Sequence, residues 1–417
     1  MFGRTKLRRL VAGFGLAAVL AAAPLGAAQA ADPVRIGLIL SMTGRYSAYG
    51  QEMSAGFQQV VDEINAAGGI KSMGGAPIET VLMDDTSEPS VAALSARKLI
   101  LDEEVSMLAG FPITALINAI GPIADQNDTL MFSFAGGRQG IAEHFFSMVF
   151  EFGPGYAENM VAFLDDTNRA QDLGIRDVVL ASSDSEPGKG IDREFEARLK
   201  ARGYNVVGIE PIPSDRADLT PTLLKIRSLD PDAVLSFIYA ADGIKLANAR
   251  FTLGYHDPLW VGGTAGYTDP GLWGKLGDEV AAATIGTNLA GLTGYSPSGK
   301  LASANALIER ARARGVTIPL GFNFVVAAQS AQIIAEALEK AGSSETAALE
   351  EALHTLVIPV GDPRLYLPKQ QGIAFNEGGT LKDQTGLLVQ WDAGKQVVVW
   401  PEAYADRAPV VTKKAGN

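Results

Sequence analysis

Hydroxyl and aromatic side chains gather in one short segment near the start of the chain. Residues 41–51 contain Ser41, Thr43, Ser47, Tyr46 and Tyr49. These groups offer neutral hydrogen-bond donors and acceptors together with aromatic faces. No adjacent base marks any hydroxyl as an activated nucleophile. The segment therefore suits the binding of a small polar molecule.

The residues on either side of this segment predict a strand and a helix. Residues 34–40 are almost all apolar, as in a parallel strand covered on both faces. Apolar residues then recur with helical spacing at Met53, Phe57, Val60, Val61 and Ile64. Ligands bind outside the carboxyl ends of parallel strands. The polar segment lies at such an end.

A second candidate lies where the predicted strand 105–109 leads into a helix over 115–125. Phe111 offers an aromatic face, and Thr114 stands at the start of the helix. Free backbone amides and the helix dipole favour an anion at that place. The Thr114 hydroxyl either donates to a bound carboxylate or caps its own helix, and the two roles are compatible.

A third candidate follows the predicted strand 130–134. Ala135 and Gly137 belong to a small-residue turn in which backbone can approach a ligand closely. Arg138 comes next. It either holds a carboxylate through a bidentate contact or is a solvated surface residue.

Groups that could support catalysis or metal binding are few. Asp84 and Asp85 are adjacent at the end of a predicted strand, so their side chains point to opposite faces of the sheet. A general acid–base pair is therefore less favoured than two carboxylates that stabilise the turn. The three histidines are far apart in sequence, cysteine is absent, and nucleotide-binding glycine motifs are missing. We expect no enzyme activity, cofactor or metal.

The composition limits where the protein can be located and which partners it can bind. The 417 residues predict about two or three domains. Residues 1–30 combine four basic residues, an apolar run and Ala28-Gln29-Ala30, which predicts a signal peptide cleaved after Ala30; a membrane anchor is the alternative. Its removal changes the formal net charge from −12 to −16. Such an acidic chain disfavours nucleic acid and anionic membranes. We expect a soluble, secreted protein.

Helices and strands alternate through the rest of the chain. Four alternations between 155 and 262 predict a second parallel sheet, and a helix-rich segment follows over 299–355. The predicted fold class is α/β, with two doubly wound lobes joined by a three-crossing hinge. Lobe 1 takes 33–148 and 288–374, and lobe 2 takes 151–285 and 378–405. Crossings are expected near 147–152, 283–290 and 372–379, with a tail over 406–417.

Three motifs carry a resemblance to a known family. S-M-T-G-x-x-x-x-Y-G over 41–50, A-A-G-G-I over 66–70 and Met83-Asp84-Asp85-Thr86 are similar to the Leu/Ile/Val-binding class of periplasmic solute-binding proteins of ABC transporters. The resemblance covers about 34–391. It implies a monomer that closes on a small molecule and delivers it to a membrane permease with its cytoplasmic ATPase. A sensor for a membrane signalling receptor and a secreted hydrolase are the alternatives.

The resemblance also assigns roles to residues. Thr114 matches a family position that holds the ligand carboxylate, and Tyr239 matches an aromatic wall. Gly137 stands where amino-acid binders usually have Thr, and Thr264 lies near the place of a Glu that pairs with the ligand ammonium. Glu186 or Asp184 could supply that charge instead. The expected ligand is a small carboxylate, either an amino acid or an organic or aromatic acid, and the absence of the family's Thr and Glu favours the organic or aromatic acid. The residues expected to hold it are Tyr46, Phe111, Thr114, Ala135, Gly137, Arg138, Glu186, Tyr239 and Thr264.

Overall fold

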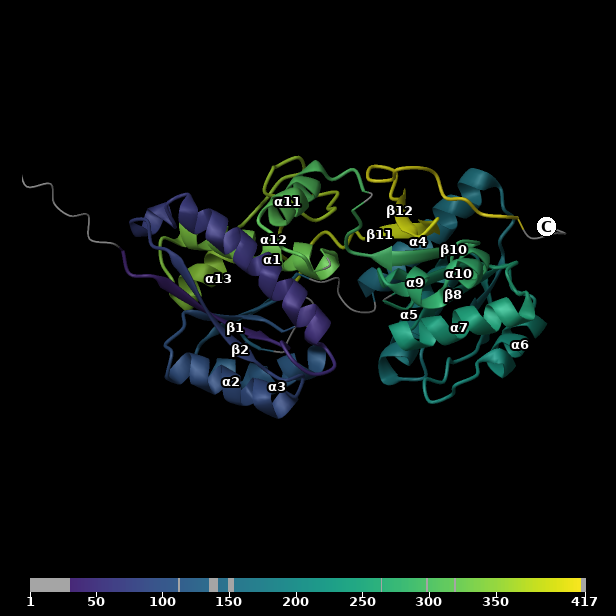
Figure 1. The fold of residues 1–417 in the computed structure, drawn as a ribbon, viewed down its shortest axis with the longest axis horizontal. Helices are drawn as coiled ribbons and strands as arrows, with labels where there is room; N and C mark the ends of the chain where they lie inside the picture. The colour runs from purple at the N-terminus through teal and green to yellow at the C-terminus, as the bar shows by residue number, and fades with distance from the viewer. Residues whose placement is uncertain are drawn as a thin grey trace, which may run out of the picture.

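The protein forms two α/β lobes that lie side by side (Figure 1). The structure is a computed structural model that describes residues 31–111, 113–134, 142–148, 154–263, 265–297, 299–318 and 320–413. The predicted signal peptide and four candidate residues (Ala135, Gly137, Arg138 and Thr264) lie outside these ranges. The α/β class with parallel sheets is confirmed.

Lobe 1 is built on a parallel sheet of order β2-β1-β3-β4-β5. Its strands are β1 (Val34–Leu40), β2 (Ile78–Asp84), β3 (Met107–Gly110), β4 (Leu130–Ser133) and β5 (Phe145–Ser147). All of β1 except Arg35 is buried. This burial explains the unbroken apolar run, because helices cover both faces of the sheet.

The two faces of this sheet have separate hydrophobic cores. One core packs under α2 (Pro89–Leu101) and α3 (Thr114–Gln126). The other packs under α1 (Ser47–Ala66), α11 (Ala302–Ala313), α12 (Phe322–Ala341) and α13 (Thr346–His354). A short 3₁₀ helix, η1 (Lys71–Met73), follows α1. Three helices of lobe 1 therefore come from the chain after it has visited lobe 2.

Lobe 2 contains a sheet of order β12-β11-β10-β9-β8-β6-β7. Its strands are β6 (Asp177–Leu180), β7 (Asn205–Ile209), β8 (Ala233–Phe237), β9 (Leu259–Gly263), β10 (Leu289–Thr293), β11 (Leu387–Asp392) and β12 (Lys395–Trp400). Strands β6 to β10 are parallel, and the β11–β12 hairpin joins β10 in antiparallel orientation.

Helices also cover both faces of the second sheet. One face carries α4 (Pro154–Gln171) and α5 (Glu186–Ala201). The other carries α6 (Thr220–Ser228), α7 (Ala240–Leu253), α8 (Ala265–Thr268), α9 (Leu272–Leu276) and α10 (Asp278–Thr284). In both lobes, helices therefore begin at the edge of the sheet where the parallel strands end.

Two predicted crossings are displaced in the structure. Strand β10 pairs with β9, so the chain is still in lobe 2 at 289–293, and the return follows Thr293 rather than lying within 283–290. Thr380 still bridges to Ser147 of lobe 1, so the last crossing lies between 380 and β11 instead of at 372–379. The reason in both cases is strand pairing with a distant segment, which local pattern does not reveal. The first predicted crossing falls mostly outside the described residues.

The segment after β12 packs on lobe 2. Val410 accepts a hydrogen bond from Gln390 at 2.9 Å through its carbonyl, and Thr412 donates to Asn288 at 2.7 Å. The expected tail is therefore attached as far as residue 413. Within the described ranges, no helix combines the length and apolarity required to cross a membrane.

The contact between α1 and α12 depends on Gly56. A Cβ at this position would lie 2.0 Å from the carbonyl oxygen of Phe324 in α12, so only glycine allows the two helices to approach this closely. We expect Gly56→Ala to lower the free energy of unfolding by about 2–4 kcal/mol because the helices must separate. Chemical denaturation measures this change.

Gly190 provides the matched control. It also lies within a helix, α5, but a Cβ there would have only the Arg193 Nη2 atom nearby, at 3.9 Å. Gly190→Ala is expected to stabilise by about 0.5–1 kcal/mol through helix propensity. Similar effects of the two substitutions would contradict the packing argument.

Candidate functional site: an interlobe tyrosine cluster

The loop after β1 is held in place by the adjacent carboxylates at the end of β2. Asp84 accepts hydrogen bonds from the Met42 amide at 2.9 Å and the Thr43 hydroxyl at 2.7 Å. Asp85 accepts from the Ser41 hydroxyl at 2.6 Å and the Ser87 amide at 2.7 Å. The pair is therefore structural, as predicted. Two of the hydroxyls that seemed suited to ligand binding are already engaged.

This loop places two stacked tyrosines at the start of α1. Tyr46 precedes the helix and Tyr49 lies in its first turn, with ring centroids 6.4 Å apart. The helix can approach the loop this closely because Gly50 has no side chain. A Cβ at this position would lie only 2.1 Å from the Ser41 carbonyl oxygen. The Arg45 guanidinium lies over the Tyr46 ring, 4.6 Å from its centroid. Lobe 1 thus presents two phenols and one cation.

Lobe 2 presents a matching aromatic group. Tyr239 precedes α7 and is 47% exposed, and its ring lies 5.6 Å from that of Phe237 at the end of β8. Phe237 in turn contacts Tyr156 in the first turn of α4, with centroids 6.0 Å apart. All three rings come from the edge of the sheet where strands end and helices begin.

The phenols of the two lobes lie close enough to influence one another. Burial, together with smaller contributions from the phenols of Tyr239 and Tyr49, raises the pKa of Tyr156 to about 12. Burial also raises the pKa of Tyr239, and Tyr46 adds to this effect. We call Tyr46, Tyr49, Tyr156 and Tyr239 the interlobe tyrosine cluster. Its phenols remain neutral near pH 7, so they offer hydrogen bonds and aromatic faces without charge.

Thr114 is the first residue of α3, as predicted. Residue 113 gives this helix no side-chain cap. Thr114 is exposed, and its hydroxyl has no hydrogen bond within the described part of the chain. The Leu116 and Ile117 amides already donate to the Ile113 carbonyl. The amides of Thr114 and Ala115 and the Thr114 hydroxyl are therefore the donors available to an anion.

The other predicted residues lie in different environments. Phe111 is fully buried between the sheet and α3, so its ring contributes to the core of lobe 1. The Glu186 side chain is 86% exposed and lies 4.0 Å from Lys189. Asp184 pairs with the same Lys189 at 3.1 Å. The roles of Ala135, Gly137, Arg138 and Thr264 stay predictions, because these residues lie outside the described ranges.

Several residues near the cluster were not singled out from sequence. Tyr156 is hidden at the start of a helix after a crossing, and Glu52 is one of many acidic residues on helix surfaces. Arg45 had a usable signal, because it directly precedes Tyr46 within the family-like motif. Asp269 of lobe 2 is within electrostatic reach of both Tyr49 and Glu52.

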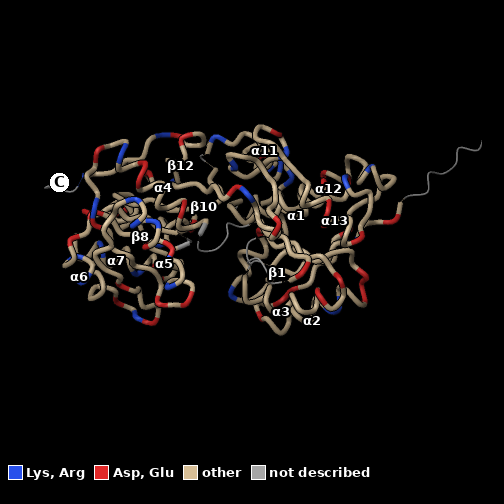
Figure 2. The backbone as a smooth tube through the Cα atoms, turned by 180° about the vertical axis from the view of Figure 1, so that it is seen from behind, with Lys and Arg blue, Asp and Glu red and all other residues tan. Residues whose placement is uncertain are grey.

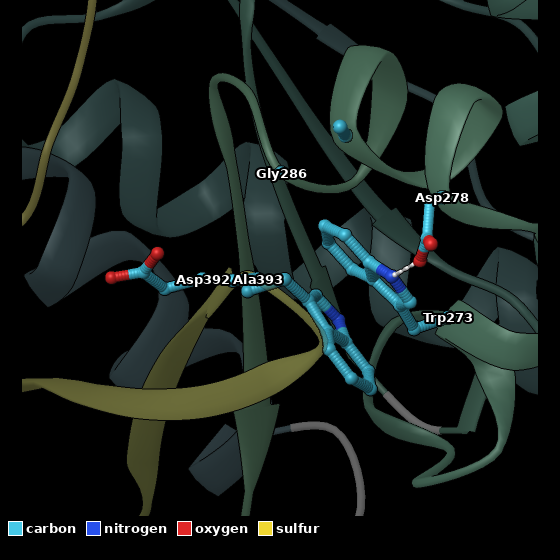
Figure 3. Close-up of a pocket in the computed structure, with 7 residues that line it drawn as sticks. Trp273, Asp278, Gly286, Asp392 and Ala393 are labelled. Carbon is cyan, nitrogen blue, oxygen red and sulfur yellow. Dashed lines mark hydrogen bonds between the residues drawn. The ribbon is translucent and has the colours of Figure 1, made fainter.

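A separate pocket of about 530 Å³ opens on the surface of lobe 2 (Figure 3). Trp273, Asp278, Trp391 and Asp392 are among the residues that line it. The Trp273 indole donates to Asp278 at 2.7 Å, and the Trp391 indole donates to the Tyr267 carbonyl at 2.9 Å. Both indole N–H groups are therefore used within the fold. The pocket contains no member of the interlobe tyrosine cluster.

The described residues contain no group of three His, Asp or Glu side chains that could hold a metal ion. His144 is engaged by two carboxylates, Glu350 at 2.7 Å and Asp128 at 3.0 Å. Basic and acidic residues are interspersed over both lobes (Figure 2). This distribution differs from the basic face expected of a nucleic-acid-binding protein.

Comparison with known proteins identifies the family. The sequence profile described as "Periplasmic binding protein" matches residues 33–396. The chain belongs to this family. Its members are solute-binding proteins of transporters rather than enzymes. The Leu/Ile/Val-binding protein BraC3 of Rhizobium johnstonii is 28% identical over 383 residues, which cover 92% of this chain and 97% of that protein.

Solved structures share the fold of this periplasmic binding protein. The branched-chain amino acid binding protein LivJ of Streptococcus pneumoniae, in complex with isoleucine, superposes with a TM-score of 0.68 at 23% identity, covering 89% of this chain and 100% of that one. A solute-binding protein of Rhodopseudomonas palustris in complex with 4-hydroxybenzoate gives 0.71 at 19% identity, covering 92% and 98%. The fold is therefore that of the type I periplasmic binding proteins.

A buried acid behind the lobe 2 edge of this periplasmic binding protein makes stability depend on pH. Asp192 in α5 is 5% exposed and accepts a 2.5 Å hydrogen bond from Ser182. Burial raises the pKa of Asp192 to about 6, and the bond to Ser182 opposes this shift. The folded protein therefore holds this proton more tightly than the unfolded chain, whose carboxyl has a pKa near 3.8.

The stability contributed by the protonated Asp192 is full below about pH 4 and is lost as the pH rises through 6. We expect the free energy of unfolding of the wild type, relative to Asp192→Asn, to fall by about 2–3 kcal/mol between pH 4 and pH 7. Denaturant titrations of both proteins across this range measure the difference. Parallel pH profiles would contradict the assignment.

Proposed function

We propose that this protein captures a small carboxylate between its lobes, closes on it, and delivers it to the permease of an ABC transporter. The observation that carries the proposal is the interlobe tyrosine cluster. Phenols from both lobes lie within mutual electrostatic reach, so a solute bound there contacts both halves. A ligand that binds the closed form more tightly than the open form shifts the population towards closure.

The carboxylate end of the ligand is assigned to lobe 1. Thr114 and the amides at the start of α3 are available to an anion. Strand β3, which precedes α3, pairs directly with β1, so the loops after both strands share one edge of the sheet. The β1 loop contributes Arg45, which makes no ion pair among the described residues and supplies positive charge at this edge.

The remainder of the ligand is assigned to the aromatic rings. Tyr46, Tyr49 and Tyr239 offer faces for an aliphatic or aromatic group, and their neutral phenols offer hydrogen bonds. Related structures hold isoleucine or 4-hydroxybenzoate, which both combine a carboxylate with an apolar body. Amino acids and aromatic acids are therefore the ligand classes to examine.

The same proposal places the protein outside the cytoplasm. Residues 1–30 have the composition of a cleavable signal peptide, and the family is periplasmic. The protein acts as a monomer that presents its closed form to the permease.

The central test is binding with compaction. We expect at least one amino acid or aromatic acid to bind the purified mature protein in calorimetry with micromolar or tighter affinity. Small-angle scattering is expected to show a smaller radius of gyration with that ligand, because hinge closure brings the lobes together. A panel in which no carboxylate binds, or in which binding leaves the radius unchanged, would overturn the proposal.

Thr114 tests the position of the carboxylate. We expect Thr114→Val, which removes the hydroxyl but keeps the shape, to weaken carboxylate binding by about tenfold. Thr317→Val is the control, because Thr317 is an exposed loop residue beyond α11. Equal affinities of the two variants in calorimetry would remove Thr114 from the site.

A further inference from the structure

Glu52 differs from the other acidic residues of α1. Asp62 pairs with Arg314 at 2.9 Å, and Glu63 pairs with Arg310 at 2.9 Å. Glu52 makes no ion pair among the described residues. Its one described partner is a neutral amide, that of Asn323, at 3.2 Å from Oε2. A partly buried carboxylate is usually paired with a cation, so Glu52 is an exception that requires an explanation.

The position of Glu52 links it to the interlobe tyrosine cluster. It lies one helical turn after Tyr49, and residues three apart on a helix are neighbours on its surface. The Asn323 amide that holds it belongs to the first turn of α12, directly beyond Gly321. Glu52 is therefore held between the first turns of two helices of lobe 1, next to the aromatic rings.

The field around Glu52 is negative. Burial raises the pKa of Glu52, the bond from Asn323 lowers it, and the carboxylate of Asp269 in lobe 2 raises it. Asp269 itself has partners, because it accepts from Lys275 at 2.9 Å and from the Gly271 amide at 2.7 Å. Of these two acids from the two lobes, Glu52 is the one that has no cation partner among the described residues.

The acids that the sequence offered for this role are placed differently. Glu186 is largely exposed, and both it and Asp184 lie beside Lys189. Both therefore have a cation nearby, which Glu52 lacks within the described part of the chain. The family position near Thr264 has no carboxylate in this chain. Glu52 is thus the acceptor that the described structure makes available.

We propose that Glu52 recognises a hydrogen-bond donor on the ligand, an ammonium or a hydroxyl group carried in addition to its carboxylate. The inference rests on the proposed function and refines its ligand class. Arg45 and the start of α3 hold the carboxylate, the tyrosines hold the apolar body, and Glu52 accepts from the donor. Acids that lack such a donor leave Glu52 unmatched when the lobes close.

The experiment compares ligands that differ only in the donor. Calorimetry on the mature protein uses phenylalanine against 3-phenylpropanoate, leucine against 4-methylpentanoate, and 4-hydroxybenzoate against benzoate. We expect the donor-bearing member of at least one pair to bind at least about tenfold more tightly than its partner. This preference is the quantity to follow in the variants.

Two substitutions separate the kinds of donor. Glu52→Leu removes the acceptor, so the preference is expected to disappear for either donor. Glu52→Gln removes the charge but keeps a carbonyl acceptor, so the preference is expected to disappear for an ammonium and to persist in part for a hydroxyl. Glu309→Gln, an exposed carboxylate on α11 without a described partner, controls for the change in net charge. Thermal unfolding of each variant confirms that it is folded.

The outcomes distinguish the inference from the function beneath it. Carboxylates that bind with no donor preference, or a preference that survives in both Glu52 variants, would overturn the role of Glu52 and leave the proposed function standing. A preference abolished by Glu186→Gln instead would transfer the role to Glu186. Failure of every carboxylate to bind the wild type would overturn both.

Discussion

The geometry of the candidate site depends on the hydrogen bonds that two adjacent carboxylates accept. Asp84 and Asp85 end the edge strand β2, yet their hydrogen bonds reach across to the loop that follows β1. Burial raises the pKa of Asp85, and its bonds from Ser41 and Ser87 lower it. Because a buried carboxylate without donors is costly, this loop has little freedom to rearrange. The position of this loop in turn fixes the position of the tyrosines at the start of α1.

In each half of the aromatic site, the rings pack against one another within their own lobe. Tyr46 stacks on Tyr49 within lobe 1, and Phe237 contacts both Tyr156 and Tyr239 within lobe 2. Each lobe therefore arrives with its rings already packed. What remains for a ligand is to connect two preformed surfaces, so little side-chain ordering is needed on binding. Under the proposed function, the free energy of closure comes from contacts that the ligand makes with both surfaces at once.

The sequence was sufficient where a role depends on local pattern. The apolar run 34–40, the helix after it and the structural role of Asp84 and Asp85 all follow from spacing and neighbours within a few residues. It was insufficient where distant segments meet. Strand β10 belongs to lobe 2 because it pairs with β9, and the residues 289–293 alone do not predict that pairing. The engagement of Ser41 and Thr43 by carboxylates more than 40 residues away had no local signal either.

The features that form the candidate site, two predicted from sequence and one missed, share a physical property: each departs from what stability alone would favour. Tyr239 keeps about half of its surface exposed, α3 begins with free amides, and Glu52 lacks the cation that Asp62 and Glu63 possess. Proteins retain such departures where function requires them. In this chain the departures from both lobes lie at the edges where strands end and helices begin. That coincidence argues for a site whose stabilising contacts are completed by a solute.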